Sequence, residues 1–336
     1  MTALTQRFKI LRSSTARREA LAAYMFLSPY LLVTLVFTVG VFLFAIYVSF
    51  TEYNLFTPPQ WVGLEHYRTL LDDTKFIRSL VNVFYYVIIV VPVQTSLALL
   101  LAVILNAPMR AKQFFRTIFY APSVTSSVVI SFIFWWLYLK TGYINFAFAK
   151  VWGLFGAEWE LVNWLNDPRG LFQLIVAPFG VDIPSSQWYL RGPSITWMAI
   201  MFQNIFTTVP TFMIMFLAAL QDISPALYEA ASIDGASKRQ QFFRVTVPML
   251  RPVILLVVVL GTIGTWQIFD QVAILTAGGP LDTTLTPVYL IYREALGLSG
   301  PSRMGYAASR AFILGLIIFF FTFVQRRFIE RGTEQY

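Results

Sequence analysis

Long runs of apolar residues separated by short polar stretches dominate the pattern of the chain. A helix that crosses a bilayer needs about 20 mostly apolar residues. Runs such as FILGLIIFFFTFV lack the two-residue alternation of a β-barrel strand. Because backbone polar groups in hydrocarbon must be satisfied within their own segment, the runs predict helices. The predicted spans cover residues 22–50, 79–106, 117–139, 196–221, 252–275 and 304–325.

Composition supports this pattern and removes several function classes. Of the 336 residues, 57% are hydrophobic, 17% are aromatic and only 12% are charged, against about 25% charged residues in an average soluble domain. The sequence has no cysteine, which excludes disulfides and cysteine-ligated metals. His66 is its single histidine, which excludes two-histidine zinc motifs and argues against a Ser-His-Asp triad. The expected fold class is an all-α polytopic membrane protein with six transmembrane helices.

The basic residues indicate on which side of the membrane each loop lies. With the N-terminus inside, the inner segments hold most of the 25 Lys and Arg residues, at more than twice the outer density. Such an excess is typical of cytoplasmic loops, so both termini are expected in the cytoplasm. The net charge of +8 then reflects topology and contact with membrane lipid, and nucleic acid is not an expected partner. The inner segments are 1–21, 107–116, 223–251 and 326–336, and the outer segments are 51–78, 140–195 and 276–310.

The outside loop 140–195 is the longest and carries Trp152, Trp159, Trp164 and Trp188. Amphipathic rings at this height suit either the membrane–water interface or a protein partner. The sequence leaves both interpretations open.

The inside loop 223–251 carries signals for two short helices. Pro225 after a serine is typical of a first helical position, and PALYEAASI is rich in good helix formers. Gly235 favours a left-handed turn that ends this helix. Ser237 and Gln240 are spaced as a capping box that starts the next helix. Spacing alone leaves open whether this hairpin binds only lipid or docks a protein.

The residues of this loop also match a family. The string EAASIDGASKRQQFFRVTVPMLRP resembles the EAA loop of ABC importer permeases, with Val-x-Val-Pro in place of the usual Ile-x-Leu-Pro. The Asp-Gly-Ala triplet within it is typical of the carbohydrate-uptake branch. Four further stretches are similar to that branch, namely GYIN at 142–145, NWLNDP at 163–168, TAGGP at 276–280 and MGYAAS at 304–309. Residues from about 170 to 195 resemble an insertion relative to shorter members.

The resemblance implies a type I ABC importer permease arrangement, with a permease domain over 22–325 between cytoplasmic tails 1–21 and 326–336. It implies a second, usually non-identical permease subunit, two ATPase subunits and an external solute-binding protein, in the plasma membrane of a bacterium or archaeon. The sequence has no G-x-x-x-x-G-K-[ST] phosphate loop. No cofactor is therefore expected in this chain, and ATP and Mg belong to the partner ATPase. The implied role is transport by alternating access, and not catalysis.

The resemblance also assigns a coupling role to the EAA loop. Its first helix would lie in a groove of the ATPase. There Glu229 would pair with a basic group or cap a neighbouring helix, and the two alanines after it would permit close approach. Gly235 would allow the sharp turn. The implied ATPase-coupling residues are Glu229, Ala230, Ala231, Asp234, Gly235 and Pro248.

Polar residues inside the predicted spans are the candidates for a solute site, because they are costly in a membrane. Sugars require amide or carboxylate groups for their hydroxyls and flat aromatic faces for their C–H side. The alternative is that these residues join helices by hydrogen bonds. The candidates are Gln203, Asn204, Trp266, Gln267, Phe269, Asp270, Gln271 and Arg310.

Arg310 has three open interpretations. It lies at a depth similar to that of Asp270 on the preceding span, which predicts an ion pair near the outer mouth. It could instead contact an anionic solute such as a sugar phosphate or glycerol phosphate, or extend to the outer headgroups.

Two other classes compete with the permease. A membrane-embedded glycosyltransferase would need paired acids, for which Asp72 and Asp73 are the local candidates, although adjacent acids in a loop are usually solvated. A secondary transporter would not need the EAA loop and commonly shows inverted repeats. A stable complex with an ATPase is expected only of the ABC permease.

Overall fold

The computed structural model describes residues 14–298 and 300–330, and helices make up most of this part. The predicted tails 1–21 and 326–336 therefore fall partly outside the described residues. Within the described residues, the strands form a single two-stranded antiparallel sheet, made of β1 (Thr51–Glu52) and β2 (Gln60–Trp61). The expected all-α fold class is confirmed.

Five helical stretches of the described chain are long and apolar enough to cross a membrane, and a bent helix pair could make a sixth. The first stretch joins α2 (Ser14–Val33), the π-helical turn η1 (Thr34–Gly40) and α3 (Val41–Ser49). The others are α5 (Thr74–Asn106), α10 (Ile195–Gln221), α14 (Arg251–Trp266) with α15 (Asp270–Leu275), and α17 (Met304–Glu330).

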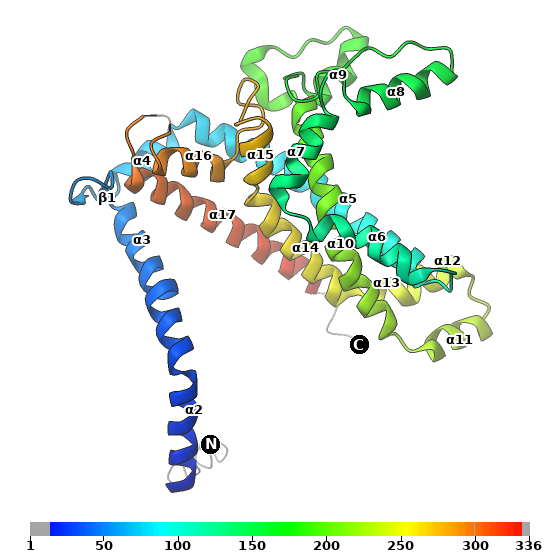
Figure 1. The fold of residues 1–336 in the computed structure, drawn as a ribbon, viewed down its shortest axis with the longest axis horizontal. Helices are drawn as coiled ribbons and strands as arrows, with labels where there is room; N and C mark the ends of the chain where they lie inside the picture. Colours follow the sequence, from blue (N-terminus) through cyan, green and yellow to red (C-terminus); the bar gives the residue numbers. More distant parts are fainter. Residues whose placement is uncertain (1–13, 299, 331–336) are drawn as a thin grey trace.

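Helices α5, α10, α14 and α17 pack together, while the first helix diverges from them (Figure 1). The first helix contacts α17 through α3, its C-terminal part, and nearly all described side chains of α2 are exposed. Exposed apolar side chains are what a bilayer solvates, so these surfaces are consistent with spanning helices.

The third predicted span is not one straight helix. Residues 117–139 were expected to form one span, but α6 (Lys112–Val124) and α7 (Ser127–Leu137) meet at 96°. The fifth span is also interrupted, because α14 ends at Trp266 and α15 begins at Asp270. Helix α7 packs directly against α15, so the two interruptions belong to one region of the molecule.

The outside loop folds around Asn145, which is buried on α8 (Tyr143–Leu154). Its amide nitrogen donates to the carbonyls of Lys140 and Val162, at 2.9 and 2.8 Å. Its amide oxygen accepts from the indoles of Trp159 and Trp164, at 3.1 and 3.2 Å. These two tryptophans therefore help to hold the loop together, and their place at the membrane interface or against a partner stays a prediction.

The segment from about 170 to 195 leaves and rejoins this loop at a narrow neck. Gly170 and Ser194 form an isolated bridge, and a side chain at Gly170 would meet the carbonyl of Arg191. The segment contains α9 (Leu171–Val176), η2 (Ala177–Phe179) and η3 (Ser185–Leu190). Two further short helices, α4 (Glu65–Leu71) and α16 (Pro287–Ala295), pack against α17.

Candidate functional site

The loop between α10 and α14 is the first candidate site. Its first arm is α11 (Pro225–Ile233), the helix predicted from the proline signal. Gly235 ends the arm with φ +77°, and no described atom lies within 4 Å of the position where its side chain would start. The serine before Pro225 occupies the N-cap position, although its side chain makes no capping hydrogen bond there. Glu229, Ala230 and Asp234 are exposed, so the arm presents its surface outward.

The second arm begins with the predicted capping box. The backbone N–H of Ser237 donates to Gln240 Oε1 at 2.7 Å, and the N–H of Gln240 donates to Ser237 Oγ at 3.3 Å. The chain then runs through α12 (Lys238–Gln241), the π-helical turn η4 (Phe242–Thr246) and α13 (Val247–Met249), which contains Pro248. This arm leads directly into α14. A movement of the loop would therefore act on the fifth span.

The second candidate site lies where the two interrupted spans meet. Gln267 is exposed between α14 and α15, and Phe269, Asp270 and Gln271 are half-buried beside it. The Phe269 ring lies 4.9 Å from that of Tyr292 in an edge contact. This group offers two amides, a carboxylate and an aromatic face over a short stretch.

The remaining candidates on α10 and α14 lie in the interior. Gln203 is 0% exposed, and its Nε2 donates to Ser131 Oγ on α7 at 2.8 Å. Trp266 is 2% exposed, and its ring lies 5.4 Å from that of Phe321. Asn204 is also buried, and its side-chain oxygen has no hydrogen-bond partner within the described chain. In this conformation Gln203 joins helices, and solute cannot reach Trp266 from the surface.

Gln94 on α5 is a polar residue that the sequence analysis missed. It is 1% exposed, and its Oε1 accepts from Thr208 Oγ1 on α10 at 2.8 Å. Its Nε2 lies 2.5 Å from the position that a side-chain carbon would take at Gly261 on α14. The amide therefore contacts α10 and α14 and joins them to α5. The cost of an amide within a predicted span was the signal that could have identified it.

Arg310 has different partners from the one expected. The predicted ion pair with Asp270 is wrong, because the Arg310 guanidinium bonds to Asp73 and to Glu294, the latter at 3.3 Å. Tyr306 Oη also donates to Asp73, at 2.7 Å. Arg310 is 5% exposed, so extension to the headgroups is wrong as well. The cluster of Asp73, Glu294, Tyr306 and Arg310 joins the start of α5 to α16 and α17.

Asp73 is held ionised by this cluster. Burial alone would raise the pKa of its carboxyl, but the Arg310 guanidinium, the Phe76 amide and the Tyr306 hydroxyl together lower that pKa below its ordinary value. Asp73 is thus a charged structural partner and not the solvated loop acid expected beside Asp72. The two aspartates do not form a free acidic pair of the kind a glycosyltransferase would need.

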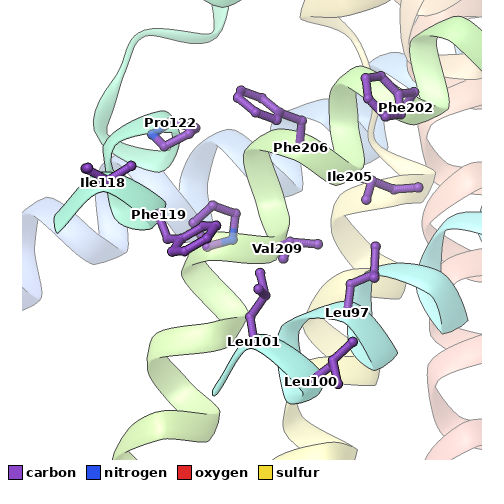
Figure 2. A pocket seen from close by; sticks show the side chains of 11 residues that line it. Leu97, Leu100, Leu101, Ile118, Phe119, Pro122, Phe202, Ile205, Phe206 and Val209 are labelled. Atoms are coloured by element: carbon purple, nitrogen blue, oxygen red, sulfur yellow. The ribbon is translucent and has the colours of Figure 1, made fainter. Parts of the chain in front are cut away.

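An apolar pocket of about 450 Å³ opens between α5, α6 and α10. Figure 2 shows Phe119, Phe202 and Phe206 around it, together with aliphatic side chains and Pro122. Its lining residues have no polar side chain, so it offers sugar hydroxyls no side-chain hydrogen-bond partner. The pocket is therefore a poor candidate for the solute site.

Together these features define a helical multi-pass membrane protein with two interrupted spans and an exposed two-helix loop. Residues 74–333 match the family described as binding-protein-dependent transport system inner membrane component. The probable ABC transporter permease YesP of Bacillus subtilis (strain 168) is 32% identical over 316 residues, covering 93% of this chain and 92% of YesP. The lactose transport system permease LacF of Rhizobium radiobacter is 31% identical over 318 residues, covering 94% and 96%.

A solved structure agrees on the fold. A chain in the crystal structure of a bacterial alginate ABC transporter, in complex with an alginate pentasaccharide-bound periplasmic protein, matches with a TM-score of 0.74 at 21% identity. The match covers 96% of this chain and 99% of that chain. The protein belongs to the family of binding-protein-dependent transport system inner membrane components. It is an ABC transporter permease subunit, a transport component and not an enzyme.

Proposed function

We propose that the chain is the permease subunit of an ATP-driven carbohydrate importer. Its partners are a second, non-identical permease subunit, two ATPase subunits that hold ATP and Mg, and an external solute-binding protein. The observation that carries the proposal is the exposed α11 arm with its elbow at Gly235, which leads through the second arm into an interrupted span. The lactose named for LacF and the alginate named for the solved transporter support a carbohydrate.

The proposed orientation has both termini in the cytoplasm of a bacterium or archaeon. Basic residues concentrate on the side that carries α11, and α8 and α9 lie at the opposite end of the bundle (Figure 1). On this orientation α11 meets the ATPases and the loop 140–195 faces the solute-binding protein.

In the proposed coupling site, α11 lies in a groove of the ATPase. Glu229 offers a carboxylate to a basic group, and the small side chains of Ala230 and Ala231 allow close approach. Asp234 and Gly235 form the turn at the end of the arm. Pro248 lies where the second arm joins the fifth span.

The proposed solute contacts are Gln267, Phe269, Asp270 and Gln271, because these candidates reach the surface at the interruption of the fifth span. Gln203, Asn204 and Trp266 lie behind them as interior support. Arg310 is buried between two carboxylates, so its charge is already balanced and does not favour a phosphate group. A neutral sugar is therefore favoured over a sugar phosphate or glycerol phosphate.

Gly235→Asp tests the coupling role. The transporter should still assemble in the membrane, but ATP hydrolysis should no longer drive uptake of radiolabelled sugars. Gly180→Asp is a matched control for assembly in the membrane and for ATP hydrolysis, because Gly180 has φ +76° and a similarly open surrounding among the described residues. Purification of the tagged chain should recover an ATPase that has a phosphate loop. Wild-type uptake in Gly235→Asp, or a chain that moves sugar without an ATPase, would contradict the proposal.

A further inference from the structure

Two polar contacts cross from the first arm of the loop to the second. Tyr228 Oη lies 2.9 Å from Thr246 Oγ1. Gln241 Nε2 donates to Ser232 Oγ at 2.8 Å and to the carbonyl of Ala236 at 3.2 Å. Ser232 Oγ in turn donates to the carbonyl of Tyr228 at 2.8 Å. The two cross-arm contacts are thus linked along α11 through the backbone carbonyl of Tyr228.

These contacts require each arm to present two residues on one face. On α11, Tyr228 and Ser232 are four residues apart, which places them on the same face of an α-helix. On the second arm, Gln241 and Thr246 are five residues apart. In an α-helix that spacing would turn the second residue by about 140° from the first. Both residues are nevertheless buried toward α11, at 4% and 5% exposed.

The π-helical turn η4 explains how the second arm achieves this. It spans Phe242–Thr246, so it begins directly after Gln241 and ends at Thr246. Hydrogen bonds from residue i to i+5 widen the turn, so that residues five apart are brought toward one face. Such π-helical turns are uncommon and concentrate at functional sites.

We propose that Tyr228, Ser232, Gln241 and Thr246 are positioning residues that fix the angle between the two arms, with η4 setting their register. The inference rests on the proposed coupling function of the loop. No described atom lies within 4 Å of the position where a side chain at Gly235 would start. Without contacts between the arms, the two arms could therefore change their angle at this glycine. The two polar contacts make the pair rigid, so that displacement of α11 reaches α14 and its interruption.

The test uses the assembled transporter in lipid nanodiscs, with the partner subunits made free of cysteine. This chain has no cysteine, so spin labels at Ile233→Cys and Met249→Cys report the distance between the arms. Both positions are exposed, at 87% and 49%. Thr246→Val, Tyr228→Phe and Gln241→Leu should each broaden a narrow wild-type distance distribution about twofold.

A second readout follows coupling without knowledge of the solute. The probe is a maleimide dye on Gln267→Cys at the interrupted span, and labelling rates are compared with and without ATP. Each variant should reduce the ATP-induced change in labelling rate about three- to tenfold, which corresponds to the net contribution of one hydrogen bond. Thr322→Val is the matched control, because the Thr322 hydroxyl bonds to carbonyls of its own helix.

The outcomes separate the two proposals. If labelling of the Gln267→Cys transporter responds to ATP, and adding Gly235→Asp removes that response, but adding any of the three variants changes it no more than the control does, the positioning proposal is overturned while the coupling function stands. If ATP leaves labelling unchanged in the Gln267→Cys transporter without a loop substitution, the coupling function itself fails. The double variant Tyr228→Phe with Thr246→Val should reduce the ATP-induced change in labelling no more than either single variant does. The reason is that both substitutions remove the same contact.

Discussion

At the scale of single residues, the Gln94 amide connects three helices because Gly261 has no side chain and leaves room for it. Gln94 occupies the space that a side chain at Gly261 would take, and it accepts from Thr208. Gly261→Ala would force the buried amide away from α14 and strain that hydrogen bond. We expect a loss of about 1–3 kcal/mol of stability, the usual cost of overpacking, measured as a lower unfolding temperature of the purified transporter.

Gly264→Ala provides the control for this prediction. It lies on the same helix, but no described atom lies within 4 Å of its added carbon. Alanine also favours a helix over glycine by about 1 kcal/mol, so this variant should be neutral or slightly stabilising. Equal unfolding temperatures for the two variants would show that Gln94 adjusts without cost.

At the scale of elements, the cluster around Arg310 joins α5, α16 and α17. Arg310→Gln would leave the carboxylate of Asp73 without its cation, whereas Glu294 would keep its ion pair with Arg303 at 3.3 Å. Removing one partner of a buried ion pair typically costs about 3–5 kcal/mol. Asp73→Asn should cost less, because Glu294 still balances Arg310. Asp270→Asn should leave stability unchanged, whereas an effect as large as that of Arg310→Gln would contradict the assignment of partners.

The same cluster predicts a pH dependence. The pKa of Asp73 is lower in the folded protein than its ordinary value of about 3.9. A lowered carboxyl pKa contributes stability that is fully present above the unfolded value and is lost as pH falls through the folded value. The stability difference between wild type and Asp73→Asn should therefore be constant from pH 5 to 8 and shrink below about pH 4, measured by thermal unfolding.

The outside loop depends on Asn145 in a similar way. Asn145→Asp keeps the oxygens that accept from Trp159 and Trp164, but it places a carboxylate against the carbonyls of Lys140 and Val162. We expect faster proteolysis of the loop and altered tryptophan fluorescence. Asn163→Asp makes the same change at an exposed position and should alter neither. Unchanged proteolysis in Asn145→Asp would contradict the role of Asn145.

Local sequence signals predicted α11. They predicted neither the interruptions of the third and fifth spans nor the cluster around Arg310. Proline at the first helical position and glycine in the turn act within a few residues, so the sequence located Pro225–Ile233. The bend after Val124 falls at threonine and serine, and no glycine or proline occupies the gap. Arg310 pairs with an acid 237 residues away. Similar membrane depth suggested Asp270, but depth alone does not decide which helix is adjacent.

At the scale of the whole molecule, the two ends of the bundle differ in charge and in structure. The inner segments, which include the loop with α11, hold Lys and Arg at more than twice the density of the outer segments, and the other end carries the folded loop with α8 and α9 (Figure 1). Positive residues are retained on the cytoplasmic side during insertion. The orientation proposed here therefore places loop 107–116 inside and loop 140–195 outside.

This orientation can be tested with two alanines, because the sequence contains no cysteine. Ala107 and Ala157 are both exposed, one in each loop. In intact cells stripped of any outer envelope, a membrane-impermeant maleimide should label Ala157→Cys and leave Ala107→Cys unlabelled until the membrane is permeabilised. The reverse pattern would place α11 outside the cell, away from ATP, and would overturn the orientation together with the coupling role of Gly235.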